Sequence, residues 1–165
     1  MNSIIVRHAS IADAVHIHRF ITDLAIFEKA EHEVKSTISD VEKTLFAPGC
    51  TAHALMVEVD GEPAGMAVYF FNYSTWLGQN GIYLEDLYVA PERRGHGLGK
   101  KLMAALAKIA TQKNCGRMDW SVLDWNQPAI DVYESIGAKP QSEWIGYRLT
   151  GDELQNLAEQ SQADV

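Results

Sequence analysis

The residues best suited to chemistry form a glycine-rich loop, residues 94–99 with the sequence RGHGLG, between a predicted strand and an amphipathic helix. Glycines at alternate positions let successive backbone N–H groups turn toward one point, because no Cβ stands in the way. The helix that follows adds the positive end of its dipole. Arg94, Lys100 and Lys101 add positive charge to a chain whose formal net charge is −8. The pattern predicts an anion site, and a pyrophosphate suits it.

The spacing of this loop excludes two other phosphate-binding motifs. A P-loop requires a glycine at the position of Arg94 and a Ser or Thr directly after Lys100, and neither is present. The dinucleotide fingerprint G-x-G-x-x-G fails because the third glycine comes one residue early and the loop does not follow the first strand. A glycine-rich turn without a ligand is the remaining alternative, but it would weaken the start of a helix for no gain.

The pattern Arg94-x-x-Gly97-x-Gly99, placed between a strand and a long helix, resembles the acetyl-CoA-binding motif of the GNAT N-acetyltransferases. Three further blocks resemble the spermidine/spermine acetyltransferase branch, which includes members that acetylate diamines and thialysine. These blocks are YLEDLYV at 83–89, DWNQPAIDVY at 124–133, and YFFNY followed by WLG within 69–78. The resemblance covers nearly the whole chain. It implies an α/β fold with a mixed, mostly antiparallel central sheet, helices on both faces, and a splay between the fourth and fifth strands.

The resemblance also implies acetyl-CoA as the acetyl donor. The pantetheine arm would pair with the backbone of the strand before the loop, and the pyrophosphate would bind to the loop itself. Lys100 stands where other members carry Ser or Thr, so a positive charge replaces a hydroxyl contact. Asn126 matches a cofactor-binding asparagine, and Tyr133 matches a tyrosine near the thioester sulfur. The expected cofactor-binding residues are Leu87, Val89, Arg94, Gly95, His96, Gly97, Leu98, Gly99, Lys100, Asn126 and Tyr133.

Acetyl transfer to an amine requires a proton acceptor, because a primary amine has a pKa of about 10 and only its neutral form attacks a thioester. Glu85 and Asp86 are adjacent in the predicted strand, so regular alternation would point their side chains to opposite faces. The resemblance favours Glu85 as a base acting through water, with Asp86 as the alternative base or a second amine anchor. An exposed strand edge is the structural alternative for both.

The leaving thiolate calls for a proton donor, and Tyr133 is the expected one. A phenol with a pKa of about 10 stays protonated at neutral pH and can donate. Packing against the core is its structural alternative, just as helix capping is for Asn126. The expected mechanism is direct transfer, with a strand N–H near Leu87 stabilising the tetrahedral charge. Cys50 and Cys115 lie in no recognisable setting for a nucleophile.

Recognition of a cationic acceptor would use carboxylates and aromatic rings. Glu28, Glu31 and Glu33 lie at and after the end of the first predicted helix, where acidic residues do not favour the helix dipole. Tyr73 and Trp76 offer aromatic faces for alkylammonium groups, although core or dimer packing would explain them equally well. The expected substrate-binding residues are Glu28, Glu33, Trp76, Glu85 and Asp86.

The elements that must position these residues follow from apolar periodicity and turn signals. Strands are predicted at 4–6, 52–59, 63–71, 82–89, 118–123 and 144–149, and Asp60-Gly61 predicts a hairpin turn between the second and third. Helices are predicted at 13–29, from the glycine loop to 114, and at 127–135. Capping boxes at Ser39-x-x-Glu42 and Thr150-x-x-Glu153 predict two further short helices. We expect one domain over residues 1–165, with a frayed tail after about residue 158.

Composition narrows the function classes. A chain of 165 residues with 47% apolar residues can build a core, and its acidity disfavours binding to nucleic acid while favouring cationic small molecules. It has no run of eighteen apolar residues and no signal-peptide pattern, so we expect a cytoplasmic protein that neither spans a membrane nor binds one. The histidines and the two cysteines show no metal-ligand spacing, so no metal is expected. The resemblance implies a homodimer.

The sequence therefore predicts an acetyl-CoA-dependent N-acetyltransferase acting on a primary amine of a small cationic acceptor, such as a diamine, a polyamine or a thialysine-like amino acid. Departures from the polyamine enzymes' acidic pattern at residues 28–33 leave the acceptor open. Two alternatives remain: acetylation of a protein lysine or N-terminus, and a sensor domain that binds acyl-CoA without catalysis.

Overall fold

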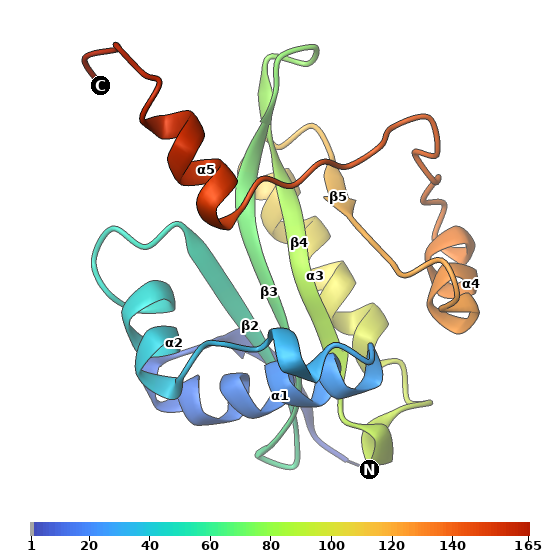
Figure 1. Cartoon of the computed structure of the whole chain (residues 1–165). Coiled ribbons are helices and arrows are strands. Elements are labelled where there is room, and N and C mark those ends of the chain that lie inside the picture. The colour runs from blue at the N-terminus through green and yellow to red at the C-terminus, as the bar shows by residue number, and fades with distance from the viewer. Residues whose placement is uncertain (1) are drawn as a thin grey trace. The chain divides into compact units, whose positions relative to one another are not determined.

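The computed structural model describes residues 2–165, in which two compact units are separated at residues 123 and 124 (Figure 1). The first unit contains the sheet and three α-helices, and the second contains two short helices. Within the described residues, no helix combines the length and the apolar character needed to cross a bilayer. The expectation of one domain over 1–165 stays a prediction.

The first unit is built on a five-stranded sheet whose spatial order equals the chain order. The first three pairings are antiparallel and the last is parallel. This confirms the expected mixed, mostly antiparallel sheet. The predicted hairpin turn is also confirmed, because Asp60 and Gly61 both have positive φ (53° and 82°), as a type I′ turn requires. The strands are β1 (Ile4–His8), β2 (Ala52–Val59), β3 (Glu62–Ser74), β4 (Gln79–Val89) and β5 (Met118–Trp120).

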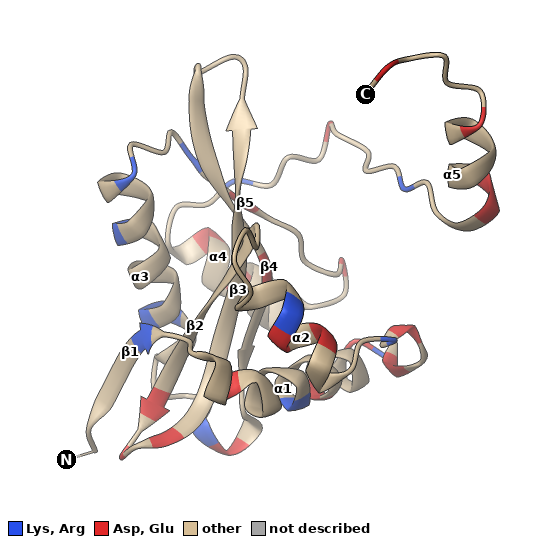
Figure 2. Cartoon of the chain, turned by 90° about the vertical axis from the view of Figure 1, so that its left-hand side faces the viewer, with Lys and Arg blue, Asp and Glu red and all other residues tan. Residues whose placement is uncertain are grey.

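Helices cover both faces of this sheet (Figures 1 and 2). On one face, α1 (Ala14–Phe27) and α2 (Ile38–Leu45) contribute Ile17, Phe20 and Val41 to a core shared with β2, β3 and β4. On the other face, α3 (Leu98–Gln112) buries Leu98, Leu102, Leu106 and Ala110, whereas Ile109, which belongs to the same apolar stripe in the sequence, is half-buried. The sheet is therefore packed on both sides, and functional groups are confined to strand ends, edges and loops.

Strand β4 is paired unequally on its two sides. Its ladder with β3 runs to Val89, whereas its parallel ladder with β5 covers Ile82 to Leu84 only. Because β5 ends at Trp120, nearly half of β4, residues 85–89, has no strand neighbour on that side among the described residues. This is the splay expected between the fourth and fifth strands. On this side, the segment of β4 that leads to the glycine loop is not bonded to β5.

A β-bulge interrupts β4 at Glu85. Leu84 pairs with Tyr69 and Asp86 pairs with Val68, so Glu85 is an extra residue without a partner on β3. A bulge of this kind bends the strand and shifts the alternation of side chains by one position. Even-numbered residues therefore change face: Leu84 lies on the α3 side with Tyr69, and Tyr88 lies in the core beneath α1.

The structure corrects several predicted boundaries. Helix α2 begins after Thr37, whose hydroxyl accepts from Asp40 N (3.2 Å) while the Asp40 carboxylate accepts from Thr37 N (2.8 Å), so the capping box lies two residues earlier than predicted. The β3–β4 hairpin is longer than predicted, because polar residues at its tip continue the ladder to Ser74 and Gln79. β5 is shorter and ends at Trp120.

The second unit consists of α4 (Gln127–Ser135), α5 (Gly151–Ala158) and irregular segments. Helix α4 has the predicted bounds, and Asn126 caps it by accepting from Ala129 N (3.4 Å). Thr150 is the N-cap of α5, but its side chain makes no capping bond. The strand predicted at 144–149 is wrong: these residues belong to no β-ladder, and an extended segment without a partner strand has no inter-strand bonds to stabilise it.

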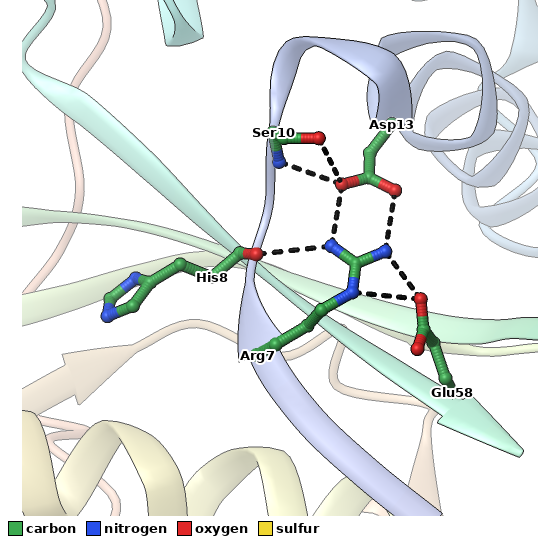
Figure 3. Close-up of polar contacts among 5 residues, drawn as sticks. All are labelled: Arg7, His8, Ser10, Asp13 and Glu58. Atoms are coloured by element: carbon green, nitrogen blue, oxygen red, sulfur yellow. Dashed lines mark hydrogen bonds and ion pairs between the residues drawn. The ribbon is translucent and has the colours of Figure 1, made fainter. Parts of the chain in front are cut away.

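A charged network that the sequence did not predict ties β1, β2 and the start of α1 together (Figure 3). The Arg7 guanidinium donates two bonds to Asp13, of 2.8 and 2.9 Å, and its Nε donates to Glu58 Oε1 at 2.8 Å. The Asp13 carboxylate also accepts from Ser10 N at 2.7 Å. Asp13 is buried, and its bonds to Arg7 lower the pKa of its carboxyl group. The network thus fixes the first helix against the edge of the sheet.

Asp13→Asn should lower the free energy of unfolding by about 1–3 kcal/mol at pH 7, because it removes one of the two carboxylates that pair with the half-buried Arg7. The pKa of Asp13 is depressed in the folded state, so its contribution is present above its unfolded pKa of about 4 and is lost as the pH falls through the folded value. Urea titrations from pH 7 to pH 3 should show the two proteins converging. Glu62→Gln, at an exposed carboxylate of β3, is the control; an equal loss there would contradict the assignment.

Candidate active site

The glycine loop has the backbone conformation that an anion site requires. Gly95 and Gly97 have φ of 84° and 74°, and a Cβ at either position would meet nothing within 4 Å. Open space therefore lies in front of both residues. Gly97 is the left-handed N-cap of α3, whose first N–H groups have no intrahelical partner. The loop residues have the geometry to hold a pyrophosphate on main-chain donors.

Gly99 differs from its two neighbours. A Cβ there would lie 3.9 Å from Val89 Cγ2, which is ordinary van der Waals contact. Neither the backbone conformation nor the packing of this unit requires a glycine at this position. The positive φ therefore requires glycine at Gly95 and Gly97 but not at Gly99. A glycine at position 99 is explained only if a ligand lies against the first turn of α3.

The charges around this loop are positive. Helix α3 carries Lys100, Lys101 and Lys108 and contains no acidic residue, as Figure 2 shows along its length. His96 is exposed, whereas the Leu98 side chain is buried in the core, so only the backbone of Leu98 can face a ligand. The lysines and the helix N-terminus together favour a negatively charged ligand.

Arg94, predicted to hold the pyrophosphate, folds back along β4 in this structure. Its Nε donates to the Val89 carbonyl at 2.9 Å. Its guanidinium carbon lies 5.6 Å from the centre of the Phe27 ring and 5.7 Å from that of Tyr88. The sequence did not predict either ring as part of the site, although Phe27 directly precedes Glu28.

Three of the predicted acceptor-binding carboxylates lie in one electrostatic environment. Burial is the main cause that raises the pKa of Asp86 to about 6, and the negative charges of Glu85 and Glu28 contribute to this value. Burial also raises the pKa of Glu28, at the end of α1. Glu85 itself is exposed. The arrangement concentrates negative charge where β4 leaves β5, which favours a cationic ligand.

The bulge affects the predicted orientation of Glu85 and Asp86. In a regular strand, the two neighbouring side chains would point to opposite faces. Because Glu85 is the unpaired residue of a bulge, regular alternation does not apply to it. Its charge nevertheless acts on Asp86. Both carboxylates therefore remain candidates for contact with the same amine.

Two predicted acceptor residues are not brought into this cluster within the first unit. Glu33 is exposed and lies 3.3 Å from the His32 ring nitrogen, in a short 3-10 turn at Glu31–Glu33. Trp76 is 84% exposed in the turn between β3 and β4. At about 3.3 Å per residue, the six positions from Gln79 to Glu85 place that turn roughly 20 Å along the strand from the carboxylates. Core packing of Trp76 is thus wrong, and its acceptor role stays a prediction.

The remaining predicted residues belong to the second unit. Asn126 caps α4, which confirms its structural role. Tyr133 lies in the last full turn of the same helix. The roles of Asn126 toward the cofactor and of Tyr133 as proton donor stay predictions. Among the residues the structure describes, no group of three or more His, Cys, Asp or Glu side chains is placed to hold a metal ion.

Comparison with known proteins identifies the class that this fold and site define. Residues 17–138 match the model of the Acetyltransferase (GNAT) family. The chain belongs to this family, and the protein is an N-acetyltransferase. A solved structure of an integron cassette protein from the mobile metagenome of V. cholerae superimposes with a TM-score of 0.79, at 25% identity, over 95% of this chain and 98% of that one.

Two curated relatives agree with the branch that the sequence blocks indicated. The thialysine N-epsilon-acetyltransferase of Sus scrofa is 38% identical over 96% of this chain and 99% of its own length. The spermidine/spermine N(1)-acetyltransferase-like protein 1 of Homo sapiens is 32% identical over 93% of this chain and 23% of its own length. The resemblance on which the fold and the reaction class were predicted is therefore confirmed.

Alanine at Gly97 and at Gly99 should have opposite effects on stability. Gly97→Ala forces a Cβ into left-handed backbone and should lower the free energy of unfolding by about 1–2 kcal/mol. Gly99→Ala lies in a helix and should raise it by about 0.5–1 kcal/mol. Coenzyme A affinity should nevertheless fall in both variants.

Thermal unfolding and titration calorimetry with coenzyme A measure the two quantities separately. A Gly99→Ala protein that is more stable and binds coenzyme A as tightly as the wild type would show that no ligand approaches this turn.

Proposed function

We propose that the protein transfers the acetyl group of acetyl-CoA to a primary amine of a small cationic acceptor. The observation that carries the proposal is the position of Glu28, Glu85 and Asp86, whose charges meet where β4 separates from β5, directly before a glycine loop. An anion site and a cation site thus lie at successive parts of one strand–loop–helix unit. A diamine, a polyamine and a thialysine-like amino acid all fit this description.

The donor side of the proposal rests on the loop. Main-chain groups of residues 94–100 and the charge of Lys100 would hold the pyrophosphate, and the free edge of β4 at Leu87 and Val89 would pair with the pantetheine arm. When bound, the cofactor supplies an acetyl group activated as a thioester. The role of the protein is to hold this group in line with the amine, since alignment alone accounts for much of the acceleration.

The acceptor side rests on electrostatics. An alkylammonium group is attracted to Glu28, Glu85 and Asp86, but it reacts only after losing a proton. A carboxylate with a pKa of about 6 is charged at neutral pH and is a stronger base than an ordinary aspartate. We therefore favour Asp86 as the proton acceptor, directly or through a water, with Glu85 as the second candidate. The relatives named for thialysine and for spermidine or spermine acetylation support an acceptor of this size and charge.

The proposal includes three features drawn from the family resemblance: Tyr133 protonates the departing thiolate, Asn126 contacts the cofactor, and the protein is a homodimer. A cytoplasmic location is proposed from the composition of the sequence. The hairpin tip offers an apolar surface for a second copy, because Tyr73, Trp76 and Leu77 are each at least half exposed there.

A thiol-release assay with acetyl-CoA tests the acceptor class. We expect turnover with thialysine, ornithine, putrescine or spermidine, and little with lysine-containing peptides, whose amine carries a bulky backbone. Turnover confined to peptides would replace the small-molecule proposal with protein acetylation. Tight binding of acetyl-CoA without turnover on any acceptor would support the sensor alternative instead.

The dependence of the reaction on pH should identify the base. If Asp86 accepts the proton, kcat/KM should fall as the pH drops through about 6, because the base is then protonated. Glu85→Gln removes a negative charge that raises the pKa of Asp86, so this limb should move to lower pH. Asp86→Asn should abolish the limb and lower kcat by about 100-fold or more. Deprotonation of the amine substrate adds the same slope to the plot of kcat/KM against pH for every variant. Differences between these plots therefore report the titration of the carboxylate in the enzyme.

Profiles of the three proteins between pH 4.5 and 8 decide between the two carboxylates. A limb that disappears in Glu85→Gln but survives in Asp86→Asn would make Glu85 the base.

A further inference from the structure

The Arg94 side chain joins the glycine loop to the end of the first helix. One nitrogen, Nε, bonds to the carbonyl of Val89 at the end of β4, and the guanidinium plane lies near the rings of Phe27 and Tyr88. Each ring centre is within about 6 Å of the guanidinium carbon, the range in which a cation and an aromatic ring attract. A residue of the cofactor loop is therefore in contact with two other elements.

Both rings are next to the acidic cluster in the chain. Phe27 is the last residue of α1, and Glu28 follows it directly. Tyr88 follows Asp86 by two positions on β4, is 5% exposed, and packs against Phe20 of α1 with ring centres 5.3 Å apart. Arg94 thus contacts the two segments whose spacing determines how far Glu28 lies from Asp86.

We propose that Arg94 is a positioning residue for the acceptor: its guanidinium holds the end of α1 against β4, so that occupation of the cofactor loop strengthens binding of the amine. This inference rests on the proposed function, since it assigns the anion to the loop and the amine to the carboxylates. It differs from a pure phosphate contact, which would leave the acceptor site unaffected.

The chemistry of arginine allows both tasks at once. Its guanidinium has five N–H donors in one plane, and Nε accounts for a single one. The four donors on the terminal nitrogens remain able to meet a phosphate while the guanidinium stays beside the rings. A phosphate bound there would fix the position of the guanidinium. Through its contact with Phe27, the guanidinium would then fix the end of α1, where Glu28 follows. Lysine has neither the plane nor the fork, so it cannot perform both tasks.

A double-mutant cycle on Phe27 and Arg94 tests the coupling. Phe27→Leu should raise the KM for thialysine about fivefold, with the KM for acetyl-CoA within about twofold of the wild type, because the ring contact with Arg94 is lost. Phe27→Tyr keeps a ring and should restore the acceptor KM. Arg94→Lys should raise both KM values. The double variant Phe27→Leu/Arg94→Lys should have an acceptor KM no higher than Arg94→Lys alone.

The matched control is Arg93→Gln, which removes a neighbouring positive charge but leaves the Arg94 contacts intact; it should not change the acceptor KM. Two results with an active enzyme would overturn the inference. One is an acceptor KM in the double variant that rises by the product of the two single-variant factors; the other is a Phe27→Leu protein in which only the KM for acetyl-CoA changes. A wild-type protein without affinity for coenzyme A would overturn the proposed function itself, so the two failures are distinct.

Discussion

Strand β4 is bonded to β3 along its whole length but to β5 only as far as Leu84, and the functional part of the molecule depends on this unequal pairing. A strand that is paired on both sides has no backbone groups left for a ligand, whereas a free edge within a packed domain can accept one as an added strand. Here the free edge runs directly into a turn whose glycines expose further N–H groups, and then into a helix N-terminus. One continuous stretch of chain therefore presents donors to an extended anionic molecule, while helices on both faces hold it rigid.

The same strand carries an electrostatic conflict. Burial makes Asp86 costly to charge, and the negative charges of Glu85 and Glu28 add to this cost. A carboxyl group whose pKa is raised in the folded state destabilises the fold as the pH rises above its unfolded value, so this cluster weakens the protein at neutral pH. The Arg7–Asp13–Glu58 network is the opposite case: its carboxylates are matched by a guanidinium, and the pKa of Asp13 falls. A cluster in which neighbouring carboxylates raise the pKa of Asp86 is best explained by a cationic ligand.

The sequence was sufficient to predict most of the fold and the family. Apolar periodicity located α1, α3 and α4, and the Asp60-Gly61 turn fixed one hairpin. The sequence was not sufficient where the local structure depends on contacts with residues far away in the chain. The segment 144–149 alternates like a strand, yet strand formation depends on a neighbour that no local pattern specifies. The contact of Arg94 with Phe27 joins residues 67 positions apart and carries no local signature. The bulge at Glu85 was equally invisible, because an apolar run on both sides of two carboxylates reads the same with or without an extra residue.

The bulge also constrains how this strand can evolve. The β3–β4 pairing before Glu85 and the pairing after it differ in register by one residue. Removing a single residue near position 85 would therefore make the ladder regular, but the side chains on one side of the deletion would move to the opposite face of the sheet. Tyr88 would then turn away from Phe20, and the register of the glycine loop would change with it. Substitutions at 85 and 86 can retune the charge of the cluster without such damage. Across related enzymes, the stretch from Ile82 to Val89 should therefore vary in residue type while keeping a constant length.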